Sequence, residues 1–214
     1  MFMKPIFTTS YVDPDLDGVA CAVAYAELLN ATGTSAMVCL MGHPTVEAEF
    51  ALSILEVPHP ADRESFAQDE RVIILDASEL VHFEGRLVPE QVIEVIDHRQ
   101  MNDAHLFVHA KVQVELVGAA ATLVAEKFHE QNFLPSTKSA QLLQAAIISN
   151  TQNFQASTTT DRDHVMMKWL HELAPLQESF TDDMFAAKSD LVGEKLERAM
   201  DIETAIFEMG GKRL

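Results

Sequence analysis

Cysteine is scarce in this chain of 214 residues, which contains only Cys21 and Cys39. Both lie in apolar stretches that are predicted to be buried, and neither belongs to a recognisable cysteine motif. This favours inert core thiols over a disulfide or a thiolate metal site.

Positive charge is also scarce, with 15 Lys and Arg against 33 Asp and Glu and a formal net charge of −18. A field of this sign repels phosphates, so we expect neither long nucleic acid nor an anionic membrane as a partner. A small phosphorylated substrate remains compatible, because bound metal ions would invert the local potential.

Long apolar runs and a signal-peptide pattern are missing from the sequence. The hydrophobic fraction of 48% and charged fraction of 22% are those of an ordinary globular protein. We therefore expect a soluble protein in the cytoplasm.

Short apolar segments alternate with helical patterns along most of the chain. This alternation predicts an α/β fold, with a mostly parallel sheet and helices on both faces. The expected strands are Ile6 to Ser10, Ala36 to Leu40, Arg71 to Leu75, Val92 to Ile96 and His109 to Glu115. The expected helices are Gly18 to Asn30, Thr45 to Leu55, Gly118 to His129, Lys138 to Ile148 and Thr160 to Leu173.

Polar clusters follow four of the apolar runs. In an open parallel sheet, ligands bind at the carboxyl ends of the strands. Carboxylates and one imidazole that converge there would form a divalent-metal site, and oxygen ligands with one imidazole suit manganese or magnesium. The clusters are Asp13 to Gly18, Asp76 to Ser78, Asp97 to Arg99 and Ser149 to Thr151.

Each cluster alone has a simpler explanation. The segment Asp13 to Gly18 is compatible with a turn or a calcium-binding loop, Asp76 with a helix N-cap, and the pair Asp97 and His98 with a surface pair. Their common position after apolar segments favours a shared metal site.

The same clusters resemble the four motifs of the DHH phosphoesterase superfamily. The most similar branch comprises the manganese-dependent family II inorganic pyrophosphatases, with the exopolyphosphatase and prune-like proteins. Three positions depart from the usual motifs: Tyr11 stands in place of a histidine, Arg99 in place of the last histidine of Asp-His-His, and Asn150 in place of an aspartate.

The resemblance implies two manganese or magnesium ions. Such an ion pair, roughly 3.5–4 Å apart, can clamp a phosphoryl group and activate a water. By this likeness Asp76 bridges both ions, Asp15 binds one, and Asp17, His98 and the residue at Asn150 bind the other.

Two neighbouring residues keep alternative roles. Asp97 either shapes the end of its strand or takes part in the network that activates water. Arg99 either holds a phosphate bidentately or forms a structural pair with Asp97 or Asp103.

The resemblance also suggests a division of the chain. Residues 1–188 correspond to the DHH-type domain, and residues 189–214 to a linker helix and the start of a second domain that is absent here. The alternating segment His109 to Glu115 favours a homodimer formed edge to edge, as in the related pyrophosphatases.

Three functions follow from these observations. The first is a metal-dependent phosphohydrolase that acts on pyrophosphate or another small phosphoanhydride or phosphoester. The second is a degenerate DHH domain that serves as a regulatory or interaction module, which Tyr11 and Asn150 favour. The third is a phosphodiesterase for short oligonucleotides or cyclic dinucleotides.

Overall fold

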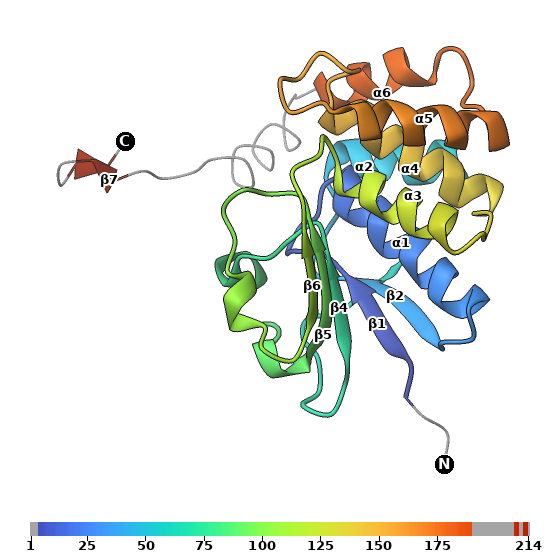
Figure 1. Ribbon diagram of the computed structural model, residues 1–214. Helices are drawn as coiled ribbons and strands as arrows, with labels where there is room; N and C mark the ends of the chain where they lie inside the picture. The colour runs from blue at the N-terminus through green and yellow to red at the C-terminus, as the bar shows by residue number, and fades with distance from the viewer. Residues whose placement is uncertain (1–3, 190–207, 210–211, 214) are drawn as a thin grey trace.

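The computed structural model describes residues 4–189, 208–209 and 212–213. Six parallel strands form one sheet in the order β3-β2-β1-β4-β5-β6 (Figure 1). The strands are β1 (Ile6–Thr9), β2 (Ala36–Leu40), β3 (Ala61–Asp62), β4 (Val72–Leu75), β5 (Val92–Asp97) and β6 (Lys111–Val114).

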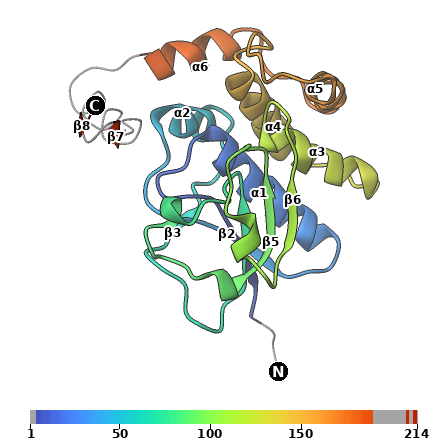
Figure 2. The same ribbon diagram turned by 60° about the vertical axis from the view of Figure 1, so that its left-hand side comes forward.

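The α-helices gather on one face of the sheet (Figure 1). Helix α1 packs directly on the central strands, and α5 forms an outer layer over α3 and α4 (Figure 2). The helices are α1 (Leu16–Ala31), α2 (Val46–Ile54), α3 (Ala120–Glu130), α4 (Thr137–Asn150), α5 (Asp161–Leu173) and α6 (Phe180–Ser189).

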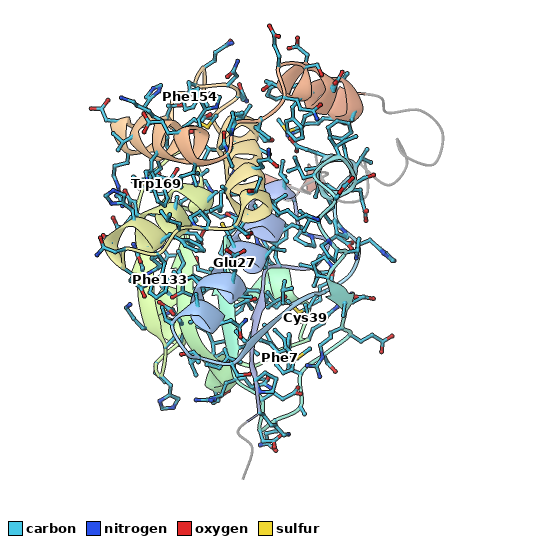
Figure 3. The ribbon with its side chains drawn as sticks, turned by 90° about the vertical axis from the view of Figure 1, so that its right-hand side faces the viewer. Phe7, Glu27, Cys39, Phe133, Phe154 and Trp169 are labelled. Carbon is cyan, nitrogen blue, oxygen red and sulfur yellow. The ribbon has the colours of Figure 1, made fainter. Side chains whose placement is uncertain are left out.

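The other face of the sheet is covered by loops and three short 3-10 helices, η1 (Leu80–Phe83), η2 (Pro89–Gln91) and η3 (Ala104–Leu106). A second hydrophobic core lies here, and it includes Phe7 and Cys39, which Figure 3 labels at the strands. The predicted α/β fold with helices on both faces is confirmed, but on this face the helices are short 3-10 turns.

The predicted strands and helices agree with the structure to within about two residues. Helix α6, the two-residue β3 and the 3-10 helices were not predicted from the sequence. The linker helix predicted within residues 189–214, at Glu194 to Glu203, lies outside the described residues. Near the C-terminus, β7 (Glu208–Met209) and β8 (Lys212–Arg213) form an antiparallel pair.

Within the described ranges, none of the helices has the length and apolar character needed to span a bilayer.

The strand order reverses at β1, whose two neighbours in the sheet are β2 and β4. The chain connections that leave the neighbouring strands at such a point run in opposite directions. They leave a crevice beside the carboxyl ends of these strands. Residues that follow β1, β4 and β5 therefore lie close together in space.

Helix α1 begins immediately beside this crevice. The Asp15 carboxylate accepts a hydrogen bond from the Gly18 N–H at 3.0 Å and so caps the helix. A Cβ atom on Gly18 would lie 2.4 Å from the Ser10 Oγ, so only glycine lets α1 approach the end of β1 this closely. This close approach places the first turn of α1 beside the ends of the strands.

Candidate metal centre

Three predicted ligands meet in this crevice. They are Asp17 in the first turn of α1, Asp76 after β4 and His98 after β5, and one ligand atom of each lies within 4.8 Å of the others. His98 Nε2 is 3.3 Å from Asp76 Oδ1 and 3.7 Å from Asp17 Oδ2. Two carboxylates and one imidazole at these separations can surround a single divalent ion.

Asp17 is fully buried and is held by the N-terminus of α3. Its Oδ2 accepts a hydrogen bond from the Ala120 N–H at 2.7 Å, and its Oδ1 accepts one from the Ala121 N–H at 2.8 Å. The amide groups and the helix dipole favour the charged carboxylate. Burial works in the opposite direction and raises the pKa of Asp17.

Asp76 carries the most direct indication of a cation site. Its side chain is fully buried, and Oδ1 has no hydrogen-bond partner among the described residues. Burial and the neighbouring Asp17 raise the pKa of Asp76. Its nearest charged neighbour is His98 Nε2 at 3.3 Å, and a buried carboxylate oxygen without a hydrogen bond is costly, so an ion between Asp76, Asp17 and His98 would satisfy it.

The backbone at Asp76 also adopts an uncommon conformation. Its φ angle is 56°, in the left-handed region that residues other than glycine seldom enter. Such strain persists where the surrounding structure imposes it, and it is concentrated at functional sites.

His98 is oriented for ligation through Nε2. Its Nδ1 lies 2.9 Å from the carbonyl oxygen of Val117, to which an Nδ1–H group donates. This arrangement leaves the Nε2 lone pair for a metal and fixes the ring. Burial acts to lower the pKa of His98, but the facing Asp76 and Asp17 outweigh it and raise the pKa to about 10. A bound cation would thus replace a proton at this nitrogen.

The other predicted site residues surround this group without joining it. Asp97 is buried, and its Oδ1 accepts hydrogen bonds from the His98 N–H at 2.7 Å and the Arg99 N–H at 3.3 Å. Its Oδ2 accepts a hydrogen bond from the Ser78 hydroxyl. These contacts fit the predicted role of shaping the strand end. Asp15 is engaged as the cap of α1.

Asn150 contacts the centre through its nitrogen. Nδ2 donates a hydrogen bond to Asp17 Oδ2 at 2.6 Å. In this orientation the amide supplies a proton to a ligand, so the role of Asn150 as a ligand through its oxygen stays a prediction.

Arg99 lies on the far side of Asp76. Its Nη2 is 3.5 Å from Asp76 Oδ2, and its Nη1 donates to His82 Nδ1 at 3.2 Å. The guanidinium Cζ lies 4.9 Å from the centroid of the Tyr11 ring. Sequence reasoning missed His82, whose only signal is its place in the loop that follows Asp76. It also missed the backbone amides of α3.

Comparison with known proteins agrees with this geometry. Over 210 residues the chain is 30% identical to a Clostridium acetobutylicum protein named "Probable manganese-dependent inorganic pyrophosphatase", with 98% of this chain and 68% of that protein covered. This chain belongs to the manganese-dependent inorganic pyrophosphatase family. A Bacillus cytotoxicus protein with the same name is 28% identical over 214 residues, which span 69% of its length.

Solved structures support the family and the predicted DHH-type fold. A Methanococcus jannaschii protein assigned to the family II inorganic pyrophosphatases matches with a TM-score of 0.79 and 27% identity, over 96% of this chain and 68% of that one. An exopolyphosphatase-related protein of Bacteroides fragilis shares the fold, with a TM-score of 0.61 and 14% identity. No protein-family model matches the chain.

Proposed function

We propose that this chain is a manganese- or magnesium-dependent phosphohydrolase that acts on pyrophosphate or another small phosphoanhydride or phosphoester. The observation that carries this proposal is the buried Oδ1 of Asp76, which accepts no hydrogen bond and faces His98 and Asp17 where the strand order reverses. Membership of the manganese-dependent pyrophosphatase family favours pyrophosphate as the first substrate to test.

Each residue has a defined part in this chemistry. Asp17, Asp76 and His98 would hold a divalent ion, which supplies an activated water and neutralises charge on the phosphoryl oxygens. Arg99, with its side chain 27% exposed, would bind a phosphate through its remaining N–H groups. Water adds to phosphorus, the bridging P–O bond breaks, and pyrophosphate yields two phosphates without a covalent enzyme intermediate.

The resemblance noted in the sequence implies two ions, and that number stays a prediction. Asp15 and Asp76 would be the protein carboxylates of the second ion. The expected cytoplasmic location also stays a prediction.

The proposed assembly is a homodimer. Strand β6 ends the sheet on one side, and Val112 on this strand is 39% exposed. Pairing of two β6 edges would remove the open backbone groups of both copies.

The degenerate domain is the second candidate. The Asn150 amide donates a hydrogen bond to Asp17 at the position where an aspartate would add a negative charge to the metal site. The lack of this charge favours weaker metal binding. This candidate predicts metal or phosphate binding without hydrolysis.

The products separate these functions, because a phosphoanhydride hydrolase releases free phosphate whereas a phosphodiesterase releases nucleotides from the oligonucleotide. The purified chain is incubated with manganese and pyrophosphate, tripolyphosphate or a short oligonucleotide, beside the variants Asp76→Asn and Asp69→Asn. Asp69 is an exposed aspartate paired with Lys4, so it provides a matched control. We expect manganese-dependent phosphate release from pyrophosphate, lost by more than about 100-fold in Asp76→Asn only, since even residues that merely support metal ligands are worth about 10–100-fold. Metal-dependent binding without phosphate release would identify the degenerate domain.

A further inference from the structure

The two oxygens of the Asp76 carboxylate face different partners. Oδ1 has no hydrogen-bond partner among the described residues and lies toward His98 and Asp17. Oδ2 lies 3.5 Å from Nη2 of Arg99. In a centre with two ions, a bridging carboxylate gives one oxygen to each ion. Here a guanidinium already lies against the second oxygen.

Arg99 is held in this position from several sides. Nη1 donates to His82 Nδ1 at 3.2 Å, and Nε lies 4.0 Å from Asp97 Oδ1. The ring of Tyr11 covers the guanidinium, with Cζ 4.9 Å from its centroid. A planar, permanently charged group in such contacts is a fixed positive charge rather than a mobile surface side chain.

The surroundings of Asp15 provide few ligands for a further ion. The phenol of Tyr11 accepts a hydrogen bond from the Asp15 N–H at 3.1 Å, and a phenol that keeps its proton is a poor ligand. The Asp15 carboxylate is engaged with the Gly18 N–H. Within the described part of the chain, a single group of three acidic or histidine ligands comes together, and Asp15 is not in it.

We propose that the chain holds one divalent ion, bound by Asp17, Asp76 and His98, and that the guanidinium of Arg99 takes the place of a second cation beside Asp76. This inference rests on the proposed hydrolase function and revises the number of ions predicted from the sequence. A phosphoanhydride would be bound between the ion and Arg99, which can contact two phosphate oxygens at once.

The inference explains why Tyr11 and Arg99 occur together. A guanidinium beside Asp76 removes the need for an imidazole at position 11, and the phenol ring in turn stacks on the guanidinium. Changing only Tyr11 would leave the Arg99 charge without its aromatic neighbour. Changing only Arg99 would leave the second metal position without an imidazole ligand at position 11.

The number of bound ions tests this directly. Manganese is titrated into the purified chain by calorimetry, bound manganese is counted by mass spectrometry after desalting, and the electron paramagnetic resonance spectrum is recorded. We expect one ion per chain and the hyperfine pattern of an isolated manganese. The double variant Tyr11→His with Arg99→His should bind a second ion and show the spectrum of an exchange-coupled pair.

Two further variants control for charge and folding. Arg99→Lys keeps the positive charge and should still bind one ion, while Arg86→His changes an arginine that pairs with Glu84 and should also bind one. Circular dichroism verifies that each variant is folded, and if the double variant does not fold, the parent and Arg99→Lys counts decide.

The outcomes separate the two proposals. Two ions in the parent chain, or in Arg99→Lys, would overturn this inference and leave the proposed hydrolase intact. No ion in the parent would overturn both. A folded double variant that still binds one ion would show that Arg99 and Tyr11 are not what excludes the second cation.

Discussion

The guanidinium of Arg99 lies over the aromatic ring of Tyr11, with Cζ 4.9 Å from the ring centroid. These are two of the three positions at which the chain departs from the usual DHH motifs. They lie far apart in the sequence, yet they contact each other beside Asp76. The two departures therefore act as one structural change and should be tested together.

The third departure gives a prediction of its own. Asn150→Asp would place a carboxylate where the amide donates to Asp17 at 2.6 Å. Without an ion, two facing carboxylates repel, so the melting temperature should fall. With manganese, the added charge should tighten binding about tenfold, which corresponds to about 1.4 kcal/mol.

A matched control lies in the turn that follows α4. Asn153→Asp makes the same charge change at an exposed residue three positions away, and it should alter neither quantity. Unchanged manganese affinity in Asn150→Asp, measured by calorimetry, would contradict the placement of Asn150 at the centre.

Metal binding should depend on pH. Burial raises the pKa values of Asp17 and Asp76, so without an ion the folded chain retains protons that the unfolded chain has released. The stability that these two groups contribute is therefore fully present at low pH and falls as the pH rises through the raised pKa values. An ion replaces these protons, so the gain in melting temperature on adding manganese should grow between about pH 6 and pH 8.

Thermal melts at several pH values and constant manganese verify this prediction. In Asp76→Asn the pH dependence of the gain should shrink, because one of the displaced protons is gone. A gain in the parent that stays constant over this range would mean that binding releases no proton.

Asp163 should be important for stability and, through α3, for the centre. It is buried and accepts hydrogen bonds from the Gly118 N–H at 2.9 Å, the Thr122 hydroxyl at 2.6 Å and the Thr160 hydroxyl at 2.8 Å. Asp163→Ala leaves these donors without an acceptor, so we expect a loss of about 3 kcal/mol in the free energy of unfolding.

Denaturant unfolding measures this loss. Asp161→Ala removes an exposed aspartate from the first turn of the same helix and should cost less than about 1 kcal/mol. Manganese affinity should also fall in Asp163→Ala, because Gly118 precedes the amides that hold Asp17. Similar unfolding midpoints for the two variants would refute the role given to Asp163.

Edge pairing of β6 should produce a dimer at micromolar concentration in sedimentation velocity. Val112→Lys places a charge on this edge and should yield monomers, whereas Val108→Lys, at an exposed residue outside the strand, should leave the dimer intact. A monomeric parent would rule out the proposed assembly.

Much of the fold could be predicted from the sequence because local patterns determine it. The buried strand β4 consists of Val72, Ile73, Ile74 and Leu75, and Asp15 caps α1 within its own segment. The clusters that contain Asp17, Asp76 and His98 could be placed at one edge of the sheet because each follows a parallel strand, and the resemblance to the DHH motifs singled out these three as ligands.

The remaining features depend on contacts between distant segments. The amides of Ala120 and Ala121 reach Asp17 across more than 100 residues of sequence, and no side-chain pattern marks a backbone donor. The orientation of the Asn150 amide and the contact of His82 with Arg99 likewise arise only from packing. The 3-10 helices are too short for a periodic signal.

Anomalous diffraction from crystals soaked in manganese tests the central claim most directly. A peak is predicted between Asp17, Asp76 Oδ1 and His98 Nε2, with the Arg99 guanidinium still against Asp76 Oδ2. Manganese peaks elsewhere on the chain, with none at this position, would contradict the account.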